Sequence, residues 1–125
     1  MKPSKPNPLR DKSLLLGVRI VRLSQYLIEQ KHEIVISKQI LKSGTNPGAM
    51  IREAQHAESS ADFIHKLAVA QKEINETAYW LELLMLSDYI NQEQFDSLNK
   101  DTIEIMKLLV SSIQTKKQNH HKTTH

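Results

Sequence analysis

Glu53 and His56 form the residue pair in this chain that most suggests metal chemistry. Their spacing of three residues places two ligands on one face of a helix, as in di-iron helical bundles. Such a site also needs a second Glu-x-x-His pair and two further inward-facing glutamates around the same centre, a set that we expect a single copy of this chain not to complete. We therefore interpret His56 as a surface histidine beside a helical glutamate, and we predict no metal site.

Three further histidines, His120, His121 and His125, stand in a polar C-terminal segment that could bind a metal adventitiously. Disorder is the preferred interpretation of this segment. Cysteine is absent, and Ser43-Gly44-Thr45 lacks the Gly-x-x-x-x-Gly-Lys frame of a phosphate-binding loop. No nucleophile elbow frames a Ser/His/Asp set. The sequence predicts no catalytic residue, no cofactor and no enzymatic activity.

A basic stripe on the first helical segment is the best candidate for function. Lys12, Arg19, Arg22 and Tyr26 share one arc of that helix when residues are placed at 100° intervals. Lysine and arginine neutralise phosphates, and a tyrosine offers a stacking face for an unpaired base. The stripe predicts contacts with an RNA or DNA backbone, and an ordinary solvated helix face is the alternative.

A second polar stripe lies on the long third helical region, where charged residues recur at steps of three and four. Lys66 and the glutamates that follow it could meet Arg52 of the preceding helix, which would make an ion network that fixes helix register. Asp62 and Lys66 form a favourable acid-before-base pair. The predicted structural network consists of Arg52, Glu53, Asp62, Lys66, Glu73 and Glu76.

The helix that carries the basic stripe is predicted over residues 11–30 and has two apolar rows instead of one. Such width means burial on two sides, either centrally in a bundle or at an interface between subunits. Small residues between the rows would let a neighbouring helix approach closely. The rows are Leu16, Ile20, Leu23 and Leu27, and Leu14, Val18, Val21 and Ile28, with Ser13, Gly17 and Ser24 between them.

A helix break is predicted near residues 43–47, between helical patterns at residues 34–41 and 47–58. Ser43-Gly44 is a plausible helix stop, and Asn46-Pro47 restarts the chain with an N-cap and a first-turn proline.

Two more helices are predicted at residues 60–87 and 91–116, each preceded by a capping signal. The simplest closure is an all-α antiparallel four-helix bundle over residues 10–116, between a disordered arm at 1–9 and a disordered tail at 117–125. The capping signals are Ser59 with Asp62, and Asn91 with Gln94.

Composition and charge agree with one helical domain. The chain has 125 residues and few glycines, prolines and aromatic residues. No apolar run is long enough for a membrane span, so a cytoplasmic location without a membrane partner is predicted. The formal net charge is +3, yet residues 1–42 carry a net +6, residues 43–104 a net −7 and residues 105–125 a net +4. This layout predicts an anionic partner, or charge complementarity between helices or subunits.

Short motifs distributed over about residues 12–113 carry a family resemblance. They are Val18-Arg19-Ile20-Val21, Ser37-Lys38-Gln39-Ile40-Leu41, Ser43-Gly44, Gly48-Ala49, Arg52-Glu53-Ala54, Ser59, Asp62-Phe63-Ile64-His65-Lys66, Lys72-Glu73, Glu76 and Tyr79-Trp80-Leu81. Together they resemble the four-helix-bundle family of bacterial 23S rRNA intervening-sequence proteins, also named S23 ribosomal proteins. That family also includes the accessory variability determinant of diversity-generating retroelements.

The resemblance implies a four-helix bundle that assembles into a ring-shaped homopentamer. It also implies nucleic-acid contacts at Lys12, Arg19 and Arg22, and an accessory role beside a reverse transcriptase or another protein. We therefore expect a non-enzymatic oligomeric nucleic-acid-binding or accessory protein. The alternatives are a self-assembling scaffold whose basic stripe pairs with the acidic region of a neighbouring subunit, and a metal-dependent bundle enzyme.

Overall fold

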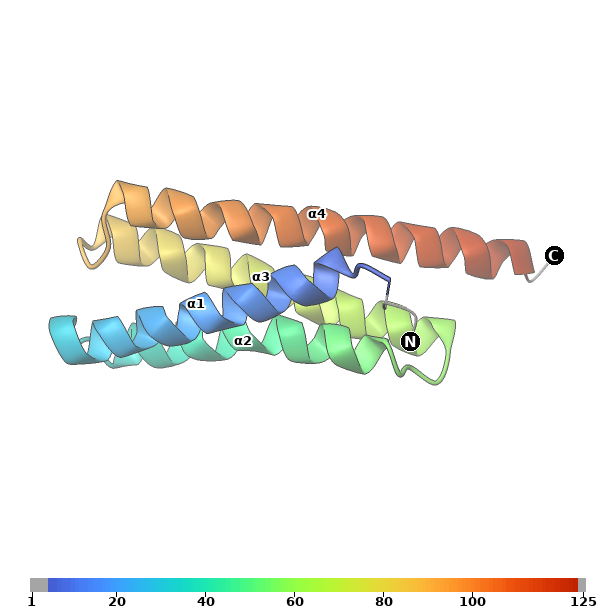
Figure 1. Ribbon diagram of the computed structural model, residues 1–125, viewed down its shortest axis with the longest axis horizontal. Coiled ribbons are helices and arrows are strands. Elements are labelled where there is room, and N and C mark those ends of the chain that lie inside the picture. Colours follow the sequence, from blue (N-terminus) through green and yellow to red (C-terminus); the bar gives the residue numbers. More distant parts are fainter. Residues whose placement is uncertain (1–4, 124–125) are drawn as a thin grey trace.

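Four helices joined by short turns make up the protein (Figure 1). The computed structural model describes residues 5–123, with side chains up to residue 119. Each helix runs antiparallel to the next, and α1 lies beside both α2 and α4, so the helices close into a bundle. The predicted all-α class is confirmed. The helices are α1 (Pro8–Lys31), α2 (Val35–Ala54), α3 (Ser60–Leu86) and α4 (Gln92–Thr123).

Aliphatic side chains from all four helices fill the core between them. The first apolar row of α1 lies inside the bundle, with every side chain of the row at most 9% exposed. Burying one such side chain stabilises the fold by about 1.5–3 kcal/mol. The other large buried side chains include Ile40 and Ile51 of α2, Leu67, Ile74, Leu81 and Leu84 of α3, Ile90 of the turn that follows, and Leu98, Ile105, Leu109 and Ile113 of α4.

The two predicted capping signals are confirmed. The Ser59 hydroxyl accepts the backbone N–H of Asp62 at 3.0 Å and starts α3. At the start of α4 the caps are reciprocal: the Asn91 side chain accepts from the Gln94 backbone and the Gln94 side chain accepts from the Asn91 backbone, both at 2.8 Å. Each cap satisfies a backbone donor that has no partner inside the helix.

α1 starts three residues before its predicted start, and α2 starts one residue after its own, at Val35. α1 begins at Pro8, where the side chain of Asn7 accepts the backbone N–H of Arg10 at 3.1 Å, so the last two residues of the predicted disordered arm at 1–9 are helical. Before α2, the buried carboxylate of Glu33 accepts two backbone N–H groups, from Ile36 at 2.9 Å and Ser37 at 2.8 Å. A carboxylate at this end also interacts favourably with the helix dipole.

Two predicted helix ends also shift. The helix predicted to reach residue 58 ends at residue 54, and α4 continues from the expected end at residue 116 to Thr123. The predicted tail at 117–125 is therefore helical over most of its length.

The predicted break near residues 43–47 is wrong, because α2 is continuous from Val35 to Ala54. Pro47 stands inside it, where the ring removes one backbone donor and typically costs about 3 kcal/mol. Here the ring is fully buried, and the hydroxyl of Thr45 donates to a carbonyl one turn earlier at 2.6 Å. Burial in the bundle overrides the local stop signal, and Asn46 lies within the helix instead of starting one.

The small residues in α2 serve close helix packing. Gly44 faces Ile20 of α1 so closely that a β-carbon on the glycine would lie 2.7 Å from Ile20 Cγ1. A buried hydroxyl pair, Ser24 and Ser37 at 2.7 Å, links the same two helices. On the other side of α2, the hydroxyl of Thr77 donates to that of Ser43 at 3.0 Å. Small side chains thus set the spacing of α1, α2 and α3.

Asp88, in the turn after α3, has a left-handed backbone conformation with φ of 65°. Because this conformation is strained for residues with a β-carbon and not for glycine, we expect Asp88→Gly to raise the free energy of unfolding by about 0.5–1 kcal/mol. Chemical denaturation monitored by circular dichroism measures the change. Ser87→Gly is the control, since Ser87 has an ordinary φ of −93° and the same substitution should destabilise. Equal effects of the two substitutions would contradict the prediction.

Candidate nucleic-acid and assembly surfaces

The basic stripe lies along the seam between α1 and α4. Nζ of Lys12 donates to Oε2 of Glu104 at 3.0 Å. Arg19 donates to Oδ2 of Asp101 at 2.6 Å, and to the carbonyl and hydroxyl oxygens of Ser97 at 3.2 and 2.7 Å. Two of the three cations of the stripe therefore have partners from the acidic region of the same chain. Charge complementarity between helices is confirmed at these two residues, within one chain.

These two ion pairs position α1 against α4 more than they stabilise the fold. The side chains of Lys12 and Arg19 are 46% and 39% exposed. Ion pairs at such exposure contribute little to stability, because water and salt screen them. The partners on α4 carry a sequence signal of their own, since Ser97, Asp101 and Glu104 recur at steps of four and three and so share one face.

The remaining part of the stripe, Arg22 and Tyr26, lines a surface cavity of about 580 Å³ between α1 and the start of α4. Arg22 is exposed and forms no ion pair with any residue that the structure describes. Glu93 lies in the wall of the same cavity. Nζ of Lys31 is 6.0 Å from the centre of the Tyr26 ring, which is half-buried. This part of the seam keeps a guanidinium beside an aromatic ring.

Lys12 lowers the pKa of Glu104 below its ordinary value, first through the hydrogen bond and then through its charge. We expect Lys12→Gln to raise this pKa toward the ordinary carboxyl value. Because the folded-state pKa is depressed, the pair contributes stability above the unfolded pKa and loses it as the pH falls through the folded value. NMR titration of the Glu104 side-chain carboxyl measures the shift. Lys100→Gln is the control and should shift the pKa less; an unchanged pKa in Lys12→Gln would refute the pairing.

The second apolar row of α1 faces away from the core. Its side chains are 39–51% exposed, and the adjacent Leu15 is 62% exposed. A β-carbon added at Gly17, between the two rows, would meet no atom within 4 Å. The row is therefore not buried in the centre of the bundle, and burial at an interface between subunits stays a prediction. We name the outer α1 face as Leu14, Leu15, Val18, Val21 and Ile28.

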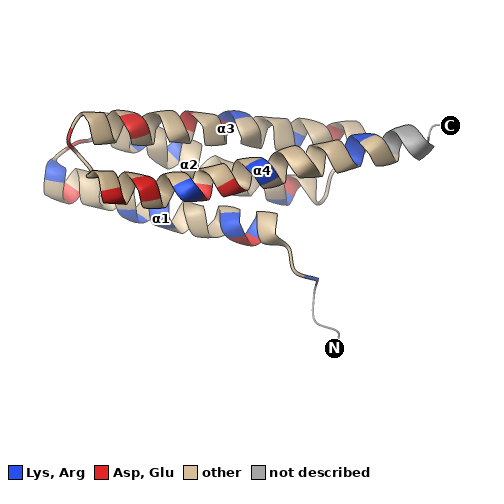
Figure 2. Cartoon of the chain, turned by 90° about the horizontal axis from the view of Figure 1, so that it is seen from above, with Lys and Arg blue, Asp and Glu red and all other residues tan. Residues whose placement is uncertain are grey.

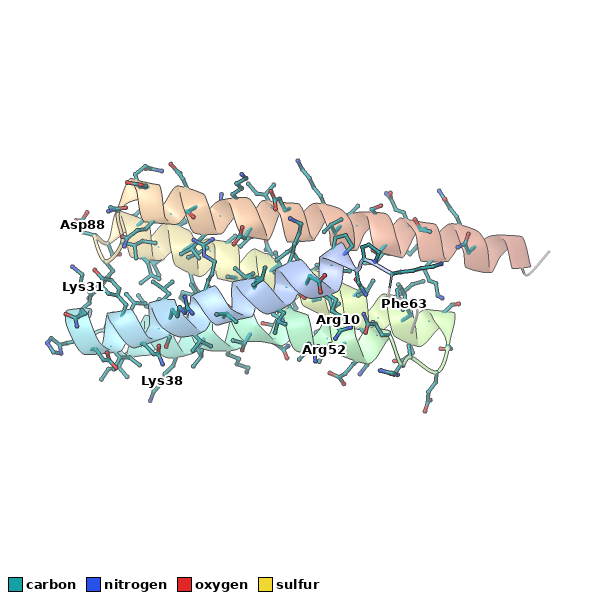
Figure 3. All side chains as sticks on the ribbon, viewed as in Figure 1. Arg10, Lys31, Lys38, Arg52, Phe63 and Asp88 are labelled. Atoms are coloured by element: carbon teal, nitrogen blue, oxygen red, sulfur yellow. The ribbon has the colours of Figure 1, made fainter. Side chains whose placement is uncertain are left out.

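A groove of about 310 Å³ runs between the outer α1 face and α2. Its walls are mostly apolar, and they include Gly17 and Val18 of α1 and Ala49 of α2. Arg10 and Arg52 line it as well, from the start of α1 and the last turn of α2 (Figure 3). Contiguous exposed apolar surface of this kind typically marks an interaction site.

The six residues of the predicted polar network do not form one network. Glu53 and Lys66 do pair, with Nζ 3.5 Å from Oε1. Asp62 instead accepts the backbone N–H of Glu58 at the start of α3, and Glu76 accepts the indole N–H of Trp80 at 3.2 Å. Glu73 contributes its backbone carbonyl to the hydroxyl of Thr77. Arg52 lines the groove between α1 and α2 and forms no ion pair with any residue that the structure describes.

The Glu-x-x-His pattern occurs twice in the chain, since Glu29 and His32 repeat it at the end of α1, a pair that the sequence reasoning missed. The antiparallel arrangement places this pair at the opposite end of the bundle from Glu53 and His56. Over the described residues, no three histidine, aspartate or glutamate side chains are grouped closely enough to hold a metal. The side chains of His120, His121 and His125 lie outside the described part of the chain.

No helix in the described residues has both the length and the apolar character needed to cross a bilayer. The fold and its surfaces define a small antiparallel four-helix bundle with an exposed apolar helix face. The chain belongs to the 23S rRNA-intervening sequence protein family, whose model matches residues 7–111. This confirms the predicted family, and the relationship to retroelement accessory proteins stays a prediction.

A solved structure from the S23 ribosomal protein family supports the same assignment. That protein, from Bacteroides thetaiotaomicron VPI-5482 and of unknown function, is 57% identical to this chain. The match has a TM-score of 0.83 and covers 84% of this chain and 97% of that chain. No curated protein matches the sequence.

Proposed function

We propose that this protein is a non-enzymatic accessory protein that assembles into a ring-shaped homopentamer and binds RNA or DNA backbones. The outer α1 face is the single observation that carries the proposal. Its five apolar side chains are 39–62% exposed in the isolated chain, and burying apolar surface gains about 25 cal/mol per Å². A second copy of the chain covers this face in the proposed assembly. The open space over Gly17 would accommodate the side chains of that copy.

Light scattering coupled to gel filtration tests the assembly. At micromolar concentration we expect a particle of five chains, each of 14.4 kDa. A particle of one chain across the accessible concentration range would overturn the proposed assembly.

The nucleic-acid role is supported by Arg22 with Tyr26 on the seam and by the description of the family, which refers to intervening sequences of 23S rRNA. Repetition around a ring would multiply a cationic field that is modest in one chain. Because phosphate binding releases counterions, affinity should fall steeply as salt rises. Fluorescence anisotropy with a labelled oligonucleotide, titrated at several salt concentrations, measures this dependence. Binding that is absent at low salt, or insensitive to salt, would overturn the role.

The second candidate function is a self-assembling scaffold without a nucleic-acid role. The ion pairs of Lys12 and Arg19 favour it, because they occupy the cations that would otherwise contact phosphates. Light scattering and fluorescence anisotropy distinguish the two candidate functions. An intact oligomer that binds no oligonucleotide at low salt would support the scaffold function.

A further inference from the structure

The charges of α4 are sorted along the helix (Figure 2). Residues 92–104 include Glu93, Asp96, Asp101 and Glu104 with a single lysine, and this part of α4 faces the basic stripe of α1. After Glu104 the chain contains no acidic residue, whereas Lys107, Lys116, Lys117 and Lys122 follow. The second half of α4 is therefore cationic and has no acidic residue in its own sequence. At a rise of 1.5 Å per residue, Lys116 lies about 18 Å along the helix from Glu104, the last acidic residue of the seam.

One lysine of this half is held in place by an aromatic ring. Nζ of Lys116 lies 4.9 Å from the centre of the Phe63 ring, in the first turn of α3. An ammonium over a ring face is attracted by the ring quadrupole. The charge is thus localised, and a ligand that binds it loses less side-chain entropy than one that must order a mobile lysine.

The localised ammonium stands at the edge of a surface hollow of about 300 Å³. The wall of the hollow is largely apolar but carries several hydrogen-bonding groups: three hydroxyl groups and one amide accompany the ammonium. Hydroxyl, amide and ammonium groups together match the phosphate and ribose oxygens of a nucleotide backbone. The lining residues are Phe63, Ser111, Ser112, Thr115, Lys116 and Asn119.

We propose that this hollow is a binding site for the backbone of single-stranded nucleic acid, with one phosphate on Lys116. The site rests on the proposed nucleic-acid function and adds a second contact, distant from the α1 stripe. We expect a flexible single strand to fit the hollow better than a duplex, because its backbone can follow the surface of the hollow, whereas the phosphates of a duplex lie on a stiff helix. Phe63 acts as a positioning residue, because it holds the ammonium and need not touch the strand.

The chain contains a matched control for this site. Lys117 is adjacent to Lys116 and exposed, but it points 100° further around the helix and does not line the hollow. Lys116→Glu and Lys117→Glu change the net charge equally, so any difference between them reports the hollow and not the overall field. The probes are labelled single-stranded RNA and DNA 20-mers of one sequence and the corresponding duplex, with anisotropy measured on the full-length protein.

We expect Lys116→Glu to weaken single-strand binding about tenfold or more at low salt, and Lys117→Glu to weaken it less than about threefold. Phe63→Leu should weaken it about threefold with the salt dependence unchanged, because the cation remains but is no longer held. Equal losses in the two lysine variants, or tighter binding of the duplex, would overturn the site while leaving the proposed function intact. No binding by the unmodified protein would overturn both. Tighter binding of RNA than of DNA would support the site and indicate that the hydroxyl groups of the hollow contact the 2′-OH of the ribose.

Discussion

Replacement of Gly44 by valine is expected to lower the free energy of unfolding by about 3–4 kcal/mol and the melting temperature by about 10 °C or more. The reason is the contact between α1 and α2. A β-carbon at position 44 would lie 2.7 and 2.8 Å from Cγ1 and Cγ2 of Ile20, well inside van der Waals contact. Ile20 is fully buried and β-branched, so its side chain is restricted at χ1 and is closely surrounded by other side chains. The two helices must separate, and the packing around them is lost.

Alanine at the same position isolates the clash from helix propensity. Alanine gains about 1 kcal/mol over glycine inside a helix, yet Gly44→Ala should still destabilise, by about 1–2 kcal/mol. Gly17→Ala is the matched control in single chains, because an added β-carbon there meets no atom of the same chain within 4 Å and only the propensity gain remains. Denaturant titrations of the three variants measure the series at protein concentrations too low for assembly, since a second copy would cover Gly17 in the proposed assembly. Equal effects of alanine at positions 17 and 44 would show that the close approach of α1 and α2 does not limit stability.

The double substitution Val18→Glu with Val21→Glu is expected to convert the assembly into folded single chains. Both side chains are about two-fifths exposed on the outer α1 face, so glutamates there remain solvated in an isolated chain. In an interface the same carboxylates would be buried against apolar surface without partners, which costs several kcal/mol. We therefore expect the dissociation constant of the assembly to rise about 1,000-fold or more.

Light scattering measures the mass of this variant, and circular dichroism checks that its helix content and cooperative unfolding are kept. Ile103→Glu is the control, since Ile103 of α4 is exposed to a similar degree but lies outside the outer α1 face. We expect the control to keep the mass of the unmodified protein. A double variant that also kept that mass would place the contact between copies elsewhere.

Most of the fold is predictable because the helices obey local rules. The caps at Ser59 and Asn91 need only side chains within one turn, and the buried row of α1 follows from residue spacing alone. The uninterrupted α2 is not predictable in this way. Ser43 and Gly44 carry the signature of a helix stop, and their role as small surfaces for α3 and α1 depends on contacts made by distant parts of the chain.

The candidate surfaces divide in the same manner. The spacing of the stripe places Lys12, Arg19 and Arg22 on one arc, and all three do lie along one seam. Which of these cations form ion pairs and which face solvent unpaired depends on the acidic residues of α4, about 80–90 residues further along the chain. The hollow at Lys116 is hidden from sequence reasoning for the same reason, because Phe63 and Lys116 meet only when α3 and α4 pack.

The ion pairs on the seam also bear on how the molecule folds and opens. They join residues 92 and 82 positions apart, whereas α1–α2, α2–α3 and α3–α4 are each joined by a short turn. Contacts of such sequence separation carry the largest loop-closure entropy, so they form after the local helical hairpins. They are also polar and solvent-accessible, and α1 and α4 share the least extensive contact of the four helix pairs, so we infer that this pairing is the weakest. We therefore expect hydrogen exchange to show that the closed bundle first opens at this seam, into an array of three consecutive helical hairpins.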